Sequence, residues 1–327
     1  MANICPSLSS ESDEGLATYE NLHHYCPFPS LPIEVLSPST LLRRGSRMHT
    51  VNFKMNPSIR LWQWPNILAI DTALAAILWQ LGLVRALNTE IGWAASAVLG
   101  LSVWLTYVAD RLFDVRSREM VALFSLRHQF AKRYRQALWY VWFVLLAMNL
   151  LLARQLTAMQ LKNGCLLLIF CLLYTILNQK LSRHFFPKEI CVALIYASGV
   201  IIFMPVAYPL GFFGVFALLC LLNCLMIGAR EKVIDAKMHV HSIATLVAER
   251  WLTLLALFGA GLAIWRGGEL WLGLALSLGL LGMLHGLRKR ISMETFRVFA
   301  DASLVLGALY ALYLGYRLGP AMISAAT

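Results

Sequence analysis

The chain has 327 residues, of which 59% are hydrophobic and only 14% are charged. Soluble globular chains carry about 25% charged residues, so this composition excludes an ordinary soluble domain and indicates a membrane protein. The formal charge of +11 is a reason to consider nucleic-acid binding, but no basic stretch is interleaved with aromatic residues outside the connections between apolar segments. We therefore expect no nucleic-acid partner and interpret the basic charge as a signal of membrane topology.

Residues 1–55 are polar and contain several prolines, with an acidic run at 11–14 and a basic pair at Arg43 and Arg44. They show no periodic apolar face, so we predict a disordered cytoplasmic tail whose basic end contacts anionic lipid. A basic region followed by an apolar run, which marks a secretory signal peptide, is not visible. The 7 cysteines form no Cys-x-x-Cys pair, and we interpret those in apolar runs as small buried hydrophobic residues.

Apolar segments of about 16 to 21 residues follow the tail, close to the length that spans a bilayer core. They cover residues 66–84, 92–109, 137–153, 163–179, 188–207, 211–228, 251–266, 270–286 and 298–317. We therefore predict an all-α, polytopic membrane domain over residues 56–327, with nine transmembrane helices.

The distribution of basic residues predicts how these helices are oriented. The connections on one side of the membrane carry 23 lysines and arginines, and those on the other side carry five. Because positive residues concentrate on the cytoplasmic side, the N-terminus is expected in the cytoplasm and the C-terminus on the far side. That arrangement requires an odd number of spans, which nine satisfies.

Two pairs of carboxylates lie where apolar segments end on the predicted cytoplasmic side. Asp110 and Asp114 follow the second segment, and Glu231 and Asp235 follow the sixth. A spacing of four residues places both members of a pair on one helical face, where they can share a divalent cation. Mg²⁺ is typically held by one or two carboxylates together with substrate phosphates.

An alternative is that these carboxylates are ordinary interfacial charges, each pair neutralised by nearby basic residues. Arg111 and Arg118 are such neighbours of the first pair, and Lys232 and Lys237 are such neighbours of Glu231. One pair alone favours this interpretation. Two pairs on the same side, four spans apart, favour a shared site.

Basic side chains suited to phosphate oxygens surround the two acidic pairs. They are Arg60, Arg111, Lys180, Arg183, Arg230 and Lys232. Carboxylates, Mg²⁺ and these cations at one membrane surface predict a site for a diphosphate.

At these residues the sequence resembles the UbiA superfamily of intramembrane prenyltransferases. Residues 106–114 match the family's first motif, Asn-Asp-x-x-Asp-x-x-x-Asp, in its last two aspartates, and 231–235 match the second motif with Glu in place of its first aspartate. Residues 58–66 resemble the start of the family's first helix, and 173–180 resemble the Tyr-to-Lys stretch that ends its fourth. The family's Arg-Pro segment after the first motif is missing. The resemblance covers about residues 56–320, and it implies nine helices around a central cavity.

The resemblance implies a role for each matching residue. Asp110 and Asp114 are expected to bind one Mg²⁺, Glu231 and Asp235 are expected to bind a second, and all four are expected to be catalytic. The residues expected to bind substrate are Arg60, Asn66, Arg111, Tyr174, Lys180, Arg183 and Lys232.

The implied activity is transfer of an isoprenyl group from a prenyl diphosphate to a lipophilic acceptor, for example an aromatic or quinone-like compound. These substrates and membrane lipid are the expected partners, and no obligate protein partner is evident. We expect the cytoplasmic (inner) membrane as the location, with the active site facing the cytoplasm.

Other interpretations stay open at this point. One is a membrane terpene cyclase on the same scaffold, and another is a transporter or a non-catalytic membrane protein. The ionisable residues cluster at one face, which argues against transport. Two further carboxylates, Asp71 and Asp301, lie inside apolar segments, where charges are costly and usually functional. Either could line an acceptor pocket, or Asp301 could pair with Arg297 one turn away.

Overall fold

The computed structural model describes residues 59–116, 125–181, 187–204, 210–237 and 243–318, all within a unit that spans 57–327. Inside these ranges the side chains of Gln179, Leu181, Val233–Lys237, Thr245 and Leu318 are not described. The predicted tail, Arg118 and Arg183 lie outside the described residues, so the predictions made for them stay predictions. The described residues form helices and contain no β-strand, which confirms the all-α prediction for this part of the chain.

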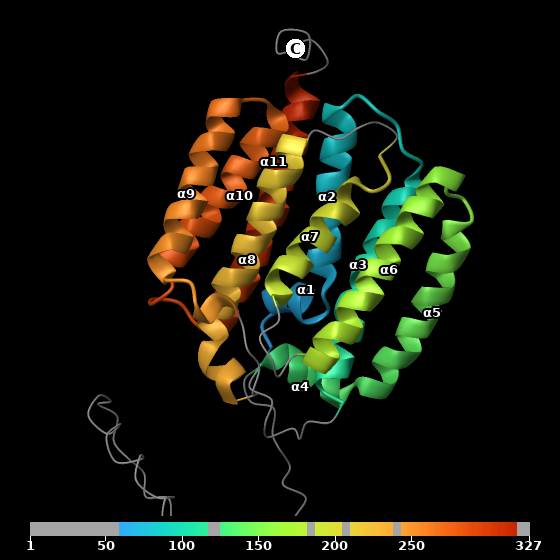
Figure 1. Ribbon diagram of the computed structural model, residues 1–327, viewed down its shortest axis with the longest axis horizontal. Helices are drawn as coiled ribbons and strands as arrows, with labels where there is room; N and C mark the ends of the chain where they lie inside the picture. Colours follow the sequence, from blue (N-terminus) through green and yellow to red (C-terminus); the bar gives the residue numbers. More distant parts are fainter. Residues whose placement is uncertain (1–58, 117–124, 182–186, 205–209, 238–242, 319–327) are drawn as a thin grey trace, which may run out of the picture. The chain divides into compact units, whose positions relative to one another are not determined.

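The helices follow the predicted apolar segments (Figure 1). The long helices are α2 (Ile70–Ala86), α3 (Trp93–Asp114), α5 (Arg135–Ala153), α6 (Ala158–Leu181), α7 (Lys188–Ile201), α8 (Leu210–Lys237), α9 (Glu249–Arg266), α10 (Glu269–Gly286) and α11 (Met293–Leu318). Shorter elements are η2 (Leu61–Gln63), α1 (Trp64–Ile67), α4 (Leu126–Arg133) and η4 (Ile243–Thr245). A helix therefore covers most of the described part of each predicted segment.

Not every helix has the length and apolarity of a membrane span. Within the described residues six do, namely α3, α5, α6, α8, α10 and α11, and a seventh span results if the bent pair of 61–67 and 70–86 is counted as one. Helix α7 has only 14 residues, and α9 carries charges at Glu249, Arg250 and Arg266. The described chain is therefore that of an all-α membrane protein with several spans, and nine transmembrane helices stay a prediction.

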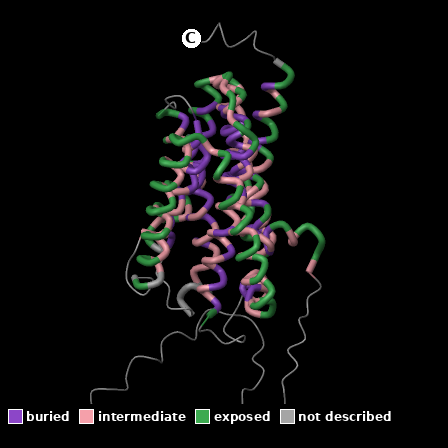
Figure 2. Tube along the Cα trace, turned by 90° about the vertical axis from the view of Figure 1, so that its right-hand side faces the viewer, coloured by how far each residue is buried: buried purple, intermediate pink, exposed green. Residues whose placement is uncertain are grey.

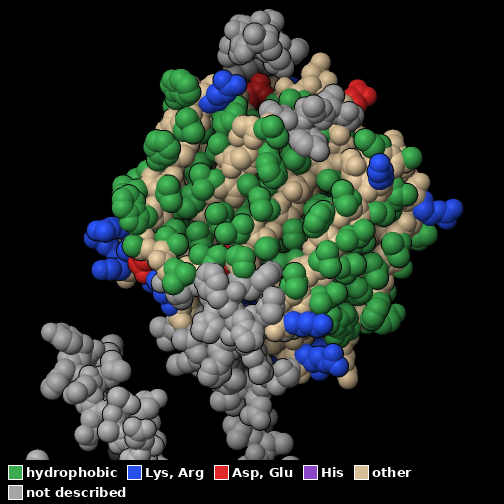
Figure 3. All heavy atoms as spheres, viewed as in Figure 1, with side chains coloured by type: hydrophobic (Ala, Val, Ile, Leu, Met, Phe, Trp, Pro, Cys, Tyr) green, Lys and Arg blue, Asp and Glu red, His purple; other side chains and the backbone are tan. Residues whose placement is uncertain are grey.

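The outer surface of the described helices is suited to lipid. Helices α5 and α6 have no buried residue in their spanning windows, and their exposed side chains include Phe143, Leu150 and Ile169. Figure 3 shows hydrophobic side chains over most of one face, with Lys and Arg towards its margins. Buried residues lie mainly on the inner faces of the helices (Figure 2). An apolar exterior of this extent belongs to an integral membrane protein.

A buried tryptophan joins three of the inner helices. Trp79 of α2 is fully buried, with its ring centroid 5.1 Å from that of Phe216 and 6.3 Å from that of Phe212, both on α8. Its Nε1 donates to the carbonyl oxygen of Leu304 on α11 at 3.0 Å. Aromatic packing and a satisfied indole N–H together fix α2 against α8 and α11.

The chain bends by 75° between the 61–67 segment and α2. At the bend Ala69 has φ 58° and ψ 23°, the left-handed conformation, which an L-residue adopts at a cost. Carbonyl groups freed by such a break need partners inside a membrane. Arg111 supplies them, since its Nη1 donates to the carbonyl oxygens of Asn66 at 3.1 Å and Ile67 at 2.7 Å. Trp104 Nε1 donates to that of Leu68 at 2.8 Å.

Candidate active site at one end of the bundle

The acidic ends of α3 and α8 lie at the same end of the bundle, next to α4 (Figure 1). Arg127 Nη2 of α4 is 3.6 Å from Glu231 Oε2 of α8. Its neighbour His128 places Nε2 3.8 Å from Asp114 Oδ2 of α3. The first turn of α11 joins them, because the Leu126 N–H donates to Glu294 Oε1 at 3.3 Å. One short helix therefore contacts both acidic segments that the sequence singled out.

Asp110 lies half-buried among basic side chains. Asn178 Nδ2 of α6 donates to Asp110 Oδ1 at a long 3.5 Å, and Lys188, Arg127 and Arg111 lie near enough to attract the carboxylate electrostatically. Sequence reasoning missed Arg127 and Lys188 because neither belongs to a matched motif. The sequence does indicate both as basic residues on the predicted cytoplasmic side.

Glu231 is held by arginines of the protein itself. Arg297, which is 1% exposed, forms an ion pair with Glu231 Oε1, and Arg127 approaches its second oxygen. The other terminal nitrogen of Arg297 donates to Glu294 at 2.9 Å and to Ser125 at 3.2 Å. The partner of Glu231 is therefore neither Lys232 nor, among the described side chains, another lysine.

Mg²⁺ requires oxygen ligands and keeps several waters when it binds to a protein. Asp110 and Asp114 fit one ion, because they offer carboxylate oxygens on one face of α3 where a phosphate can complete the shell. Glu231 does not fit in this conformation, since arginines hold both of its oxygens. Within the described side chains no group of three or more His, Cys, Asp or Glu residues can hold a metal ion. The side chain of Asp235 is not described, so a second ion at Glu231 and Asp235 stays a prediction.

The predicted substrate-binding residues occupy different environments. Arg60 and Lys180 are exposed, and Lys232 Nζ lies 3.9 Å from Glu249 Oε1. Tyr174 of α6 lies close enough to Asp110 for the charge of that carboxylate to act on the tyrosine hydroxyl. The structure places Arg111 at the helix break described above, so its contact with substrate stays a prediction.

A second polar cluster lies deeper in the bundle. Asn66 Nδ2 donates to Asp71 Oδ2 at 2.9 Å and to Asp301 Oδ2 at 2.6 Å. Asn223 Nδ2 of α8 donates to Asp301 Oδ1 at 2.9 Å. Among the described residues no ion pair joins Asp301 to Arg297, whose terminal nitrogens contact Glu231, Glu294 and Ser125 at the bundle end. Two carboxylates thus share one asparagine amide inside the protein.

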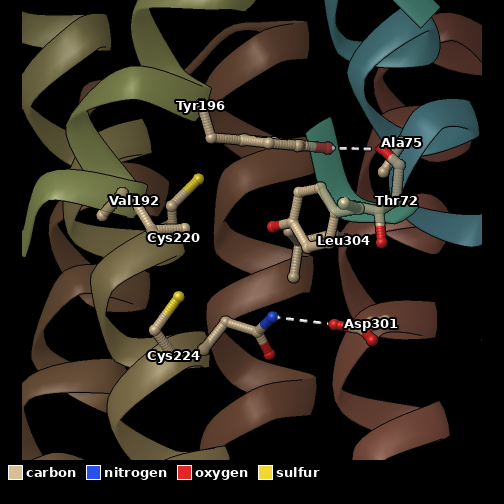
Figure 4. A pocket seen from close by; sticks show the side chains of 11 residues that line it. Thr72, Ala75, Val192, Tyr196, Cys220, Cys224, Asp301 and Leu304 are labelled. Carbon is tan, nitrogen blue, oxygen red and sulfur yellow. Dashed lines mark hydrogen bonds between the residues drawn. The ribbon is translucent and has the colours of Figure 1, made fainter. Parts of the chain in front are cut away.

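A small cavity of about 30 Å³ adjoins this cluster (Figure 4). It is lined by Thr72, Ala75, Tyr107, Val192, Ala193, Tyr196, Cys220, Asn223, Cys224, Asp301 and Leu304. Tyr196 reaches across it from α7 and donates to the carbonyl oxygen of Thr72 on α2 at 2.8 Å. Tyr107 precedes Asp110 by three residues on α3, so the cavity lies about one helical turn inside that carboxylate. Its volume admits about two water-sized groups and no isoprenyl chain.

No family model and no curated protein sequence matches this chain. Among solved structures, the chain is similar to a UbiA homolog. The apo structure of a UbiA homolog from Aeropyrum pernix K1 matches with a TM-score of 0.48 and 14% sequence identity, over 73% of this chain and 96% of that chain. At such identity the substrate, metal and acceptor of this chain have to be inferred from its own residues.

Proposed function

We propose that the protein is an intramembrane prenyltransferase of the UbiA type, which uses Mg²⁺ to transfer an isoprenyl group from its diphosphate to a lipophilic acceptor. The observation that carries the proposal is the meeting of both acidic segments with several arginines at one end of an apolar bundle. An anionic headgroup attached to a hydrocarbon chain matches such a site, since the headgroup needs cations and the chain needs a membrane.

The diphosphate is proposed to bind over Asp110, where basic side chains already concentrate. Lys188 and Arg127 offer donors to its oxygens, and a guanidinium matches phosphate with two parallel hydrogen bonds. Mg²⁺ held by Asp110 and Asp114 would neutralise the charge that develops on the departing diphosphate. Arg60, Lys180 and Lys232 remain proposed partners of the same group.

The residues next to Asp110 suit the carbon end of the substrate. Tyr107 lines the cavity one turn inside that carboxylate, and Tyr174 lies near both Asp110 and Cys224. An aromatic ring face attracts the positive charge that develops on an allylic carbon. The surrounding apolar helices exclude water, which would otherwise capture that carbon.

The ion pair of Glu231 and Arg297 is proposed to position the site. It ties α8 to α11, and Arg127 extends the same cluster to α4. Because Glu231 neutralises Arg297 and part of the charge of Arg127, the remaining basic charge is directed towards the α3 side. The site is proposed to face the cytoplasm from the inner membrane.

The test is incubation of the purified protein with a panel of prenyl diphosphates and Mg²⁺, followed by measurement of released diphosphate and mass spectrometry of the lipid extract. We expect Mg²⁺-dependent release that Asp110→Asn and Asp114→Asn abolish. Glu90→Gln is the control, because Glu90 is an exposed carboxylate in the connection between α2 and α3. Release from no member of the panel would contradict the proposal, and a cyclic hydrocarbon made without acceptor would indicate the cyclase instead.

A further inference from the structure

We propose that the cavity beside Asp301 is the acceptor subsite, and that it recognises the hydroxyl group of a lipid alcohol, with Asp301 receiving the hydroxyl proton. This inference rests on the proposed function and names the class of its acceptor. It departs from the aromatic or quinone-like acceptor that the resemblance suggested.

The cavity contains a hydrogen-bond acceptor that lacks a donor. Asn223 is 8% exposed, and its Oδ1 has no hydrogen-bond partner among the described residues. Its Nδ2 is already used, because it donates to Asp301. Native proteins rarely leave a buried amide oxygen unpaired. A ligand with an O–H donor satisfies this oxygen, whereas a ligand with acceptors alone does not.

The cavity lining has both polar and apolar parts. Asn223 and Asp301 provide the polar part, and Ala75, Val192 and Leu304 contribute apolar wall. A volume of about 30 Å³ accommodates a hydroxyl and the carbon that bears it, and it is too small for an aromatic ring. Free water would satisfy the polar part and leave the apolar part without contacts. The lining therefore fits a primary alcohol on a hydrocarbon chain better than water or a phenol.

Asp301 is suited to receive a proton. Each of its oxygens accepts one hydrogen bond from a neutral amide, that of Asn66 or that of Asn223. Arg297, one turn away on α11, forms its ion pairs with Glu231 and Glu294, and among the described residues no ion pair joins it to Asp301. An ionised carboxylate whose hydrogen bonds come from neutral amides can act as a general base and take up a proton.

The proposed step is balanced in atoms and electrons. The alcohol oxygen forms a bond to the first carbon of the isoprenyl group, and the bond from that carbon to the diphosphate oxygen breaks. The diphosphate leaves with the electron pair. The single hydroxyl hydrogen, which Asn223 Oδ1 accepts when the alcohol binds, is released as the new carbon–oxygen bond forms and passes to Asp301. The product is an ether. Tyr107, which lines the cavity, lies about one turn of α3 from Asp110. The alcohol in the cavity and the diphosphate over Asp110 would therefore lie at adjacent turns of that helix.

The first experiment measures recognition without catalysis. Tritiated farnesol is bound to the protein in lipid nanodiscs and is displaced by unlabelled farnesol or by farnesyl methyl ether, which has the oxygen but cannot donate. We expect the ether to compete about tenfold less well, as the loss of one buried hydrogen bond predicts. Equal competition in the unmodified protein would overturn the proposal, and this comparison needs no variant.

A matched pair of variants locates the effect. Asn223→Leu is expected to remove the tenfold difference. Asn149→Leu is expected to keep it, because Asn149 also has an unpartnered buried Oδ1 but lies outside the cavity and donates to Ser102 of α3. If farnesol still competes better than farnesyl methyl ether in Asn223→Leu, or if both variants lose this preference equally, the hydroxyl is recognised elsewhere in the protein.

The second experiment measures turnover with a prenyl diphosphate, Mg²⁺ and 1-hexadecanol in ¹⁸O water. An ether without ¹⁸O is expected, and ¹⁸O in a prenyl alcohol would make water the acceptor and refute the alcohol assignment. Asp301→Asn is expected to lower kcat at least a hundredfold while the affinity for inorganic pyrophosphate is unchanged. Full turnover in that variant would remove the proton-transfer role. If no diphosphate is released at all, the proposed function fails, while the binding comparison still decides the subsite.

Discussion

The ion pair between Glu231 and Arg297 distinguishes two roles for the second acidic motif. As a metal ligand, Glu231 would affect activity with little effect on stability. As the partner of an arginine that is 1% exposed, it should affect the stability of the whole bundle. We therefore expect Glu231→Gln to lower the free energy of unfolding.

The magnitude follows from the surroundings of Arg297. Removing one partner of a buried ion pair costs about 3 to 5 kcal/mol, because the other charge is left without compensation. Arg297 would keep its 2.9 Å contact with Glu294, so we expect a value at the lower end, about 3 kcal/mol. Replacing both partners, as in Glu231→Leu with Arg297→Met, should recover most of that loss, since burying two charges is itself costly.

The measurement is an SDS titration of the purified protein, followed by circular dichroism. Glu249→Gln is the matched control, because Glu249 also pairs with an arginine, Arg288, at 2.7 Å but its side chain is 39% exposed. That variant should lose at most about 1 kcal/mol. The reasoning is refuted if Glu231→Gln is no less stable than Glu249→Gln, or if the double substitution is as unstable as the single one.

Three further substitutions test the packing that supports the site, by the same titration. Trp79→Phe should cost about 1 to 2 kcal/mol, because it removes the bond to Leu304 and leaves a gap beside α8; an unchanged stability would contradict this. Gly307→Ala should cost about 1 to 3 kcal/mol, since a Cβ there lies 2.5 Å from the Gly273 carbonyl oxygen. Gly214→Ala meets nothing within 4 Å and should not lower stability. Arg111→Met should cost about 1 to 3 kcal/mol by leaving the Ile67 carbonyl at the helix break without its donor, and a neutral result would show that the break does not depend on Arg111.

Hydropathy predicted the helices well because it reports which segments avoid water. The apolar segments at 92–109 and 211–228 correspond to α3 and α8, and both acidic pairs follow the apolar parts of their helices as expected. The split of basic residues predicted that these helix ends lie on one side, and the contacts of Arg127 and His128 with both helix ends agree with that placement.

The break before α2 could not be predicted from the sequence. It occurs at Ala69, a residue with no preference for the left-handed conformation, and it is stabilised by Arg111 and Trp104, which lie more than 30 positions away. Long-range side-chain contacts of this kind leave no local pattern. The same limit explains why Arg111 was assigned to phosphate binding on its position in a motif alone.

Helix α11 contributes one residue to each of two clusters. Arg297 belongs to the ion pairs at the bundle end, and Asp301 belongs to the deeper polar cluster. Helix α11 carries Arg297 and Asp301 one turn apart, and a helical spacing of four residues ordinarily favours their pairing. The structure separates them, since Glu231 binds the arginine and two amides bind the aspartate. Glu231 therefore pairs with the arginine that lies one turn from Asp301, and two amides are the hydrogen-bond donors to that aspartate.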